Sequence, residues 1–338
     1  MERQSNIEIL RIIATLMVIT VHTAFFSLGL PKVFNGSKLA VSTIQIWAIP
    51  AVDIFVLISG YFQIRPKVKS LGNYLFQIFF YSISIYLLSL ALGQCQLSLH
   101  GIMECFFMTD ANWFIKSYLL LFIISPILNA FVDSSSKQMH CSIILAMLAY
   151  QTIFDFATRA DLSIRNGYST MSFILLYLIG SYIRKYSMGG GKTKVVAVGM
   201  SLYLMMLLPV ISSYLGFLDA HYASKYLQHG LAYSNPLIIG VAVCYLLFFL
   251  KVEVKSKIIN WVAISSFAAF LIHANPNVIR IFKAFVILQF KSDTLVCYIG
   301  FVAVFVTSIF VASVIIDKIR MFLWNLLWNN IGKRYVRK

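Results

Sequence analysis

The sequence predicts an all-α polytopic integral membrane protein with about ten transmembrane helices in one bundle. Of its 338 residues, 60% are hydrophobic and only 12% are charged, a composition outside the range of soluble globular domains. The hydrophobic residues form stretches of roughly 17–25 positions, which is the length that crosses a bilayer as an α-helix. The alternating polar and apolar pattern of membrane β-strands is absent, which leaves helices as the spanning elements.

Ten stretches are interpreted as membrane spans. They lie at about 7–28, 40–62, 73–93, 113–132, 139–156, 170–184, 195–214, 232–250, 259–288 and 294–317. The ninth contains Pro276, Arg280 and Lys283. We therefore expect its membrane-crossing part to stop near Asn275 and an interfacial helix to follow.

The distribution of lysine and arginine predicts the orientation of these spans. If the N-terminus is inside, the inner loops and the C-terminal tail carry most of the basic residues, and the outer loops carry fewer and more scattered ones. Positive residues gather on the cytoplasmic side of membrane proteins, so both termini are predicted to be cytoplasmic. The same asymmetry accounts for the net charge of +16 without a nucleic-acid partner. A run of glycines at 189–191 is predicted to form a flexible inner loop.

The first predicted helix carries two ionisable residues on one face. Ser5 and Glu8 have the spacing of a capping box and predict where the helix starts. Ten residues separate Arg11 from His22, so the two side chains are about 20° apart around the helix and about 16 Å apart along it. Arg11 can be a topology anchor that snorkels to the surface, and His22 can be a buried, hydrogen-bonded histidine. Ionisable groups at membrane depth nevertheless tend to line substrate or proton pathways.

The second span contains the segment VDIFVLISGYF, with Asp53 inside it. A buried carboxylate needs a partner, and a histidine or arginine on a neighbouring helix is the expected one. Ser59 and Gly60 have small side chains, which allow two helix backbones to approach closely.

These segments resemble the membrane-bound acyltransferase 3 family of polytopic O-acyltransferases. The first helix of that family carries arginine, ten residues and histidine, as Arg11 and His22 do, and its second helix reads like DIFVLISGYF. Later helices are similar to NWFIKSYLLLFIISPILN at 112–129 and to SSFAAFLIHANP at 265–276. The chain departs from the family at Phe55 and Val56, where many relatives have two aromatic residues.

The resemblance covers about the whole chain and implies its domain organisation. Residues 1–318 are expected to form the acyltransferase 3-like transmembrane domain. Residues 319–338 are expected to form a basic amphipathic cytoplasmic tail along the inner interface. We find no esterase-like domain in the sequence, so the membrane domain is expected to act alone or with a partner.

The resemblance also implies the chemistry. Such a protein takes an acyl group, most simply acetyl from acetyl-CoA, on the inner side of a bacterial-type cytoplasmic membrane. It places the group on a sugar hydroxyl of an envelope polysaccharide or glycolipid. The expected partners are therefore acyl-CoA, the envelope glycan and membrane lipids. No bound cofactor is implied, and the five cysteines form no metal-binding pattern.

The family's motif residues receive expected roles from this resemblance. Arg11 fits the donor side as a cation for the phosphates or the thioester carbonyl of acyl-CoA. Arg65 and Lys67 can pair with further phosphates, although setting the topology is an alternative reason for both. His22 fits the acceptor side, because an imidazole with an ordinary pKa near 6.5 can take the proton of a sugar hydroxyl or accept the acyl group itself. Asp53 would orient that imidazole, as a carboxylate does in a catalytic triad.

Three further residues are candidates for substrate binding. Asn112 follows Glu104 and Asp110 on the outer side and can bind sugar hydroxyls, with ordinary loop solvation as the alternative. Trp113 is either a residue of the interfacial aromatic belt or a surface on which a sugar stacks. His273 precedes a helix end broken by proline and either lines the acceptor cavity or lies at the interface.

Two other classes of function compete with an acyltransferase. A transporter or flippase of a glycolipid or polysaccharide intermediate would use Arg11, Asp53 and His22 as pathway groups, but we detect no inverted repeat in the sequence. A purely structural membrane protein is the second competing class, and it would have no need for Arg11 and His22 on the same face of one helix. Consumption of acetyl-CoA that depends on a glycan acceptor separates the first class from the other two.

Overall fold

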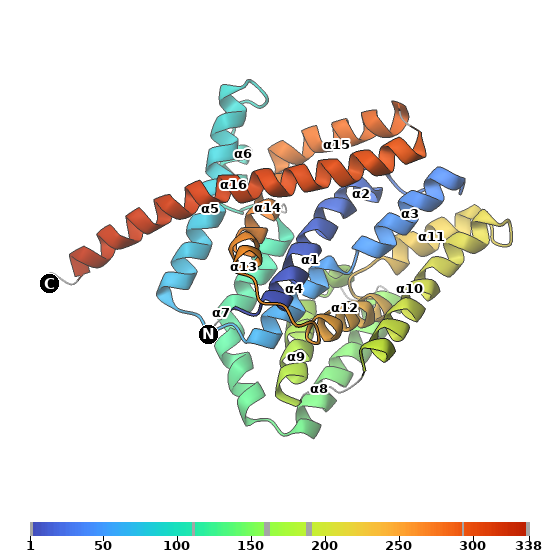
Figure 1. Ribbon diagram of the computed structural model, residues 1–338, viewed down its shortest axis with the longest axis horizontal. Helices are drawn as coiled ribbons and strands as arrows, with labels where there is room; N and C mark the ends of the chain where they lie inside the picture. The colour runs from blue at the N-terminus through green and yellow to red at the C-terminus, as the bar shows by residue number, and fades with distance from the viewer. Residues whose placement is uncertain (1–2, 110–111, 159–162, 187–190, 293, 336–338) are drawn as a thin grey trace. The chain divides into compact units, whose positions relative to one another are not determined.

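The computed structural model describes residues 3–109, 112–158, 163–186, 191–292 and 294–335 (Figure 1). These residues form helices joined by short connections, which confirms the predicted all-α class. In chain order the elements are α1 (Ser5–Thr23), α2 (Phe25–Leu28), α3 (Gly36–Ala48), α4 (Ala51–Phe62), α5 (Val68–Ala91), α6 (Leu99–Cys105), α7 (Trp113–Ser134), α8 (Lys137–Tyr150), η1 (Gln151–Ala157), η2 (Arg165–Gly167), α9 (Thr170–Tyr186), α10 (Lys192–Tyr214), α11 (Ala220–Gly230), α12 (Pro236–Phe249), α13 (Lys257–Ala263), α14 (Ser266–His273), α15 (Pro276–Ser292) and α16 (Leu295–Tyr335).

By length and composition, the described residues contain seven helical segments able to cross a membrane, or eight with a bent pair. The seven are Ser5–Leu28, Gly36–Phe62, Val68–Ala91, Trp113–Ser134, Lys137–Ala157, Lys192–Tyr214 and Leu295–Asn329, and each coincides with a predicted span. The bent pair coincides with the predicted ninth span. The count of ten is not confirmed, because the two remaining stretches form α9 and α12, which have only 17 and 14 residues.

Pro276 interrupts the predicted ninth span close to the position where its membrane-crossing part is predicted to end. The segment Lys257–His273 and the segment Pro276–Lys291 meet at an angle of 82°. Pro276 starts α15, and the side chain of Asn275 accepts a hydrogen bond from the backbone N–H of Asn277 at 3.0 Å. An asparagine cap followed by proline is a favourable helix start. The expected helix end near Asn275 is therefore confirmed, and the interfacial position of the helix that follows stays a prediction.

The helices cluster into two compact units, whereas the sequence predicted one bundle. The first unit comprises residues 1–65 and 113–260, and the second comprises residues 66–112 and 261–338. The predicted glycine loop at 189–191 lies outside the described residues except for Gly191, which caps the start of α10.

Helix α4 lies at the centre of the first unit, where it packs against α1, α9 and α12. Two glycines permit its close crossing with α9. A Cβ atom on Gly60 would overlap the carbonyl oxygen of Tyr177, and one on Gly180 would overlap the carbonyl oxygen of Leu57. The prediction that Gly60 allows close backbone approach is confirmed, and Gly180 supplies the same property on the partner helix.

A three-way hydrogen-bonded cluster fixes the chain just after α4. The Asn129 side chain donates to the carbonyl oxygen of Ile64 at 2.8 Å, and it accepts from the Tyr177 hydroxyl at 2.6 Å. The N–H of Ile64 in turn donates to the Tyr177 hydroxyl at 2.9 Å. Asn129 is the last residue of the family-like segment 112–129, and these bonds give it a structural role.

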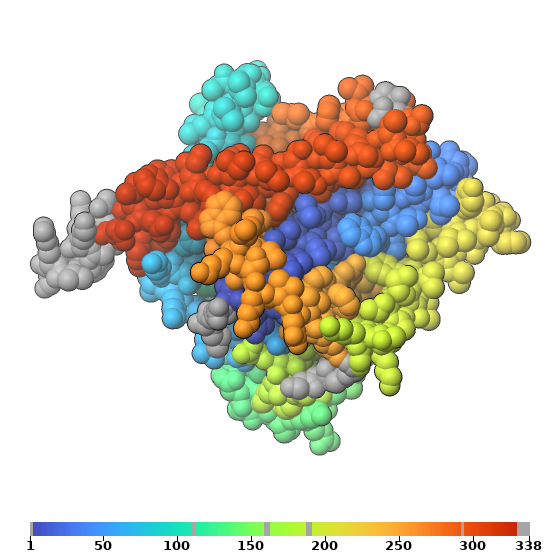
Figure 2. Space-filling view, viewed as in Figure 1, coloured from blue at the N-terminus to red at the C-terminus, as the bar shows by residue number. Residues whose placement is uncertain are grey.

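Helix α16 dominates the second unit and continues without a break from Leu295 to Tyr335 (Figures 1 and 2). Its buried Asp317 accepts hydrogen bonds from Arg320 at 2.7 Å and from Tyr81 of α5 at 2.9 Å. Arg320 also donates to Asn73 of α5 at 3.0 Å. The predicted boundary between domain and tail at 318 falls inside this cluster and stays a prediction.

Candidate active site

Helix α1 carries both Arg11 and His22 within one uninterrupted stretch, Ser5–Thr23. Its apolar side chains Ile7, Leu10 and Ala14 are fully buried, whereas Arg11 and His22 remain partly exposed. Because the helix is regular between the two residues, the shared face that their spacing predicts is retained.

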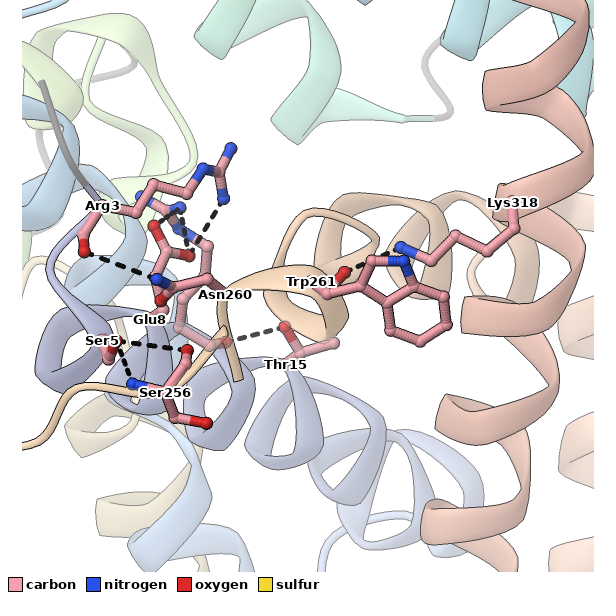
Figure 3. Close-up of polar contacts among 9 residues, drawn as sticks. Arg3, Ser5, Glu8, Thr15, Ser256, Asn260, Trp261 and Lys318 are labelled. Carbon is pink, nitrogen blue, oxygen red and sulfur yellow. Dashed lines mark hydrogen bonds and ion pairs between the residues drawn. The ribbon is translucent and has the colours of Figure 1, made fainter. Parts of the chain in front are cut away.

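Glu8 holds two arginines at the start of α1 (Figure 3). Nη1 of Arg11 donates to the two Glu8 carboxylate oxygens at 2.9 and 2.8 Å, and Nη1 of Arg3 lies 3.4 Å from one of them. The Nε and Nη2 donors of Arg11 bond to no described residue, and 27% of its side chain is exposed. Glu8 therefore fixes the guanidinium while three of its five N–H donors, on Nε and Nη2, stay available for an anion.

The predicted start of the helix is confirmed, but the hydrogen bonds of the predicted capping box do not form. Gln4 is the capping residue and its side chain makes no capping bond. The Ser5 hydroxyl instead donates to the carbonyl oxygen of Ser256 at 3.3 Å and accepts from the N–H of Ser256 at 2.9 Å. Glu8 binds two arginines that are close to it in sequence, so only the Ser5 side chain of this motif makes a tertiary contact.

These contacts form one wall of a groove, here named the α1 groove, with a volume of about 860 Å³. The side chain of Asn6 donates to the carbonyl oxygen of Phe249 at 2.9 Å and ties α1 to the end of α12. The lining includes three cationic residues, Arg3, Lys255 and Lys257, and one carboxylate, Glu253. The N-terminus and the segment after residue 250 were predicted to lie on the same side of the membrane, and the structure places them side by side (Figure 3).

His22 lies in the last turn of α1, half-buried, with its ring 4.5 Å from that of Phe26. The Ser27 hydroxyl donates to the His22 backbone carbonyl and so stabilises the turn that ends the helix. The imidazole is thus held at the end of α1 opposite to the arginine cluster.

Asp53 is fully buried in the first turn of α4. Neither carboxylate oxygen has a hydrogen-bond partner in the described chain, so the expected bond from a histidine or arginine is not present. No histidine or arginine on the three helices packed on α4 bonds to Asp53: His22 lies in the last turn of α1, Arg11 of α1 binds Glu8, and the basic residues of α9 lie in its last turn. The N-terminal position places Asp53 near the positive end of the α4 dipole.

The other predicted binding residues have different surroundings. Arg65 and Lys67 are both exposed. Asn112 lines a polar cavity with Glu104, Asn275 and Asn277, and its volume of about 10 Å³ is near that of one water probe.

The remaining two predicted residues are in aromatic surroundings. Trp113 packs 4.5 Å from the ring of Tyr168 and 5.9 Å from that of Tyr233. His273 is 1% exposed and a nitrogen of its ring bonds to the carbonyl oxygen of Ala269 in its own helix. This is the environment of a packing residue, and the role of His273 in substrate binding stays a prediction.

Sequence reasoning missed Tyr118, which lies at a helix contact. Its hydroxyl is 3.0 Å from the hydroxyl of Ser59, between α4 and α7. Isolated polar residues in apolar stretches are the only sequence signal for such contacts, and that signal does not reveal the partner.

The fold and the site together define a multi-pass integral membrane protein with a cationic cluster and a histidine on one helix. The chain belongs to the acyltransferase 3 family, whose acyltransferase domain matches residues 4–317. This confirms the resemblance and supports acyltransferase activity. Neither the search of curated proteins nor the search of solved structures found a match.

Arg11→Lys is expected to raise the KM for acyl-CoA about tenfold without lowering the amount of protein in the membrane. Lysine keeps the charge and can satisfy Glu8, but it lacks the planar fork whose remaining donors reach a second group. A tenfold change corresponds to ~1.4 kcal/mol, the scale of one charged hydrogen bond. Steady-state kinetics in membranes measure the KM, and an unchanged value would leave Arg11 as a topology anchor only.

Proposed function

We propose that the protein is an integral membrane O-acyltransferase that transfers acetyl from acetyl-CoA to a sugar hydroxyl of an envelope polysaccharide or glycolipid. The observation that carries this proposal is the arrangement on α1. A guanidinium with unused donors lies near one end, and an imidazole lies on the same face near the other end. In a chain of the acyltransferase 3 family, that arrangement suits an anionic donor on one side and a hydroxyl acceptor on the other.

The α1 groove is the proposed place for the nucleotide part of the donor. Coenzyme A carries several phosphate charges, and Arg3, Lys255 and Lys257 supply cations at this groove. Its volume lies within the range of small-molecule sites, about 300–1,000 Å³. Glu8 links Arg3 of the groove to Arg11, which itself does not line the groove, so Arg11 would meet a part of the donor beyond the nucleotide. Arg65 and Lys67 are exposed and remain proposed as additional phosphate contacts.

His22 is the proposed catalytic residue. Its imidazole takes the proton of the acceptor hydroxyl while the hydroxyl oxygen attacks the thioester carbonyl carbon. The carbon–sulfur bond breaks, and the departing CoA thiolate takes the proton from the imidazolium. In the alternative route the imidazole attacks first and carries the acyl group before the sugar oxygen receives it. In this proposal the pantetheine arm spans the separation of about 16 Å along α1 between Arg11 and His22.

A double charge removal, Lys255→Gln with Lys257→Gln, tests the donor assignment. We expect the KM for acetyl-CoA to rise about tenfold with kcat little changed, because contacts to the nucleotide bind ground state and transition state alike. Lys192→Gln is the matched control, since Lys192 is an exposed cation in the first turn of α10 that does not line the groove.

The assay uses purified protein in nanodiscs with envelope polysaccharide whose ester groups have been removed by mild alkali. Equal effects of the control and the double variant would show general surface charge only. Wild-type protein that never consumes acetyl-CoA in the presence of this acceptor would contradict the acyltransferase proposal and favour the transporter.

A further inference from the structure

Three aromatic rings from distant parts of the chain meet in the first unit. Trp113 starts α7, Tyr168 precedes α9, and Tyr233 precedes α12. Their ring centroids are 4.5 Å apart for Trp113 and Tyr168, 5.1 Å for Tyr168 and Tyr233, and 5.9 Å for Trp113 and Tyr233. All three segments were predicted to lie on the outer side, and we name the three residues the aromatic cluster.

The cluster has one buried tyrosine and one exposed tyrosine. Tyr233 is 8% exposed, whereas Tyr168 is 40% exposed. Phe173 is buried, and its ring centroid lies 6.0 Å from that of Trp113. The exposed ring of Tyr168 is therefore supported by aromatic neighbours that fix its orientation.

The backbone that presents Tyr168 is strained. Arg165, Asn166 and Gly167 have φ angles of 53°, 58° and 87°, and two adjacent non-glycine residues in the left-handed region are uncommon. A Cβ on Gly167 would overlap Tyr233 and the backbone of Ser234, so this glycine allows the loop to lie against the cluster. Strained backbone that is held in place by its surroundings is concentrated at binding sites.

A buried carboxylate stabilises this strained loop. Asp155 is 2% exposed, and its Oδ1 accepts a hydrogen bond from the N–H of Asn166 at 2.9 Å. Ile164 is buried at the start of the loop. The loop is thus anchored on both sides of Arg165, whose side chain is exposed two positions before Tyr168.

We propose that the exposed face of Tyr168 binds a pyranose ring of the acceptor glycan by stacking, with Arg165 donating hydrogen bonds to its oxygen atoms. The C–H groups on one face of a sugar ring carry partial positive charge and are attracted to the negative face of an aromatic ring. The guanidinium has five donors and no acceptor, which suits hydroxyl, carboxylate or phosphate oxygens of an envelope glycan. This inference rests on the proposed function for the identity of the ligand.

The alternative for these rings is the aromatic belt of membrane proteins, in which tryptophan and tyrosine side chains lie at the membrane–water interface. An interfacial ring needs no particular backbone conformation and no fixed aromatic neighbours. The strained Arg165–Gly167 turn and the buried Asp155 contact therefore favour a binding site.

Direct binding of alkali-treated envelope polysaccharide to protein in nanodiscs tests this site without a need for turnover. Tyr168→Ala and Tyr168→Leu are expected to raise the Kd about five- to tenfold, and Tyr168→Phe to leave it within twofold. Leucine keeps the apolar bulk and tests the aromatic face even if the alanine variant folds poorly. Tyr222→Ala is the matched control, because Tyr222 is an exposed tyrosine of α11, also on the predicted outer side.

The results distinguish a failure of the Tyr168 stacking site from a failure of the proposed acyltransferase function. Equal weakening by Tyr168→Leu and Tyr222→Ala, or a wild-type Kd unchanged by Tyr168→Leu, would overturn the stacking site. Wild-type protein that does not bind the polysaccharide would overturn it as well. If wild-type protein binds the polysaccharide through Tyr168 but consumes no acetyl-CoA, the sugar site stands and the acyltransferase proposal fails.

Discussion

His22→Gln is expected to lower acyl transfer to the glycan at least about 100-fold, the low end of the contribution of general acid–base catalysis. Glutamine keeps much of the size of histidine and some of its hydrogen bonding, but it takes up no proton near neutral pH. The packing against Phe26 tolerates a side chain of this size, so the protein should still insert and fold. Transfer to alkali-treated polysaccharide is measured alongside membrane expression.

His221→Gln is the matched control, because His221 is an exposed histidine of α11 and is expected to be dispensable. Near-normal transfer by His22→Gln would defeat the catalytic assignment. Wild-type protein incubated with radiolabelled acetyl-CoA alone distinguishes the two routes. Label retained on His22 indicates an acyl-histidine intermediate, and label absent from the protein indicates direct transfer.

Gly60→Ala is expected to destabilise the protein by about 1–3 kcal/mol, the usual cost of forcing a group into a packed interior. A helical glycine that becomes alanine normally gains ~1 kcal/mol from helix propensity. Here the new methyl group meets the Tyr177 carbonyl, a backbone atom that cannot rotate away. The melting temperature in detergent should fall by several degrees, and expression should fall with it.

Gly300→Ala supplies the comparison, because Gly300 lies inside α16 and a Cβ there meets no atom within 4 Å. This variant should be neutral or slightly stabilised. A Gly60→Ala protein as stable as the wild type would show that α4 and α9 can move apart without a loss of stability. That result would contradict the role of Gly60 in their close crossing.

The parts of the fold that depend on local sequence could be predicted. The length of apolar stretches predicted seven segments that coincide with candidate spans, and Pro276 predicted the break in the ninth. The eleven-residue spacing of Arg11 and His22 predicted a shared face because helix geometry is constant over that distance. Gly60 was recognisable because only a very small side chain suits two helices in close contact.

The parts that depend on tertiary partners could not be predicted. Ser5 has the position of a capping-box residue, but its hydroxyl bonds instead to Ser256, which is distant in sequence. Asp53 has no hydrogen-bond partner in the described chain, and the sequence does not reveal which side chains meet its carboxylate. Tyr168 carried no motif, and only the arrangement of three helix starts brings it to Trp113 and Tyr233.

The length of α16 makes the thickness of the surrounding bilayer a variable in the behaviour of this protein. The helical segment Leu295–Asn329 has 35 residues, which is about 52 Å of helix, and a hydrocarbon core is only about 30 Å thick. Tilting by about 20° shortens the projected length only slightly. Several turns must therefore lie outside the hydrocarbon, and the charged residues Asp317, Lys318 and Arg320 favour the turns after residue 316 for that position. A change in bilayer thickness would thus move the hydrocarbon boundary along the same helix that holds the buried Asp317–Arg320 pair.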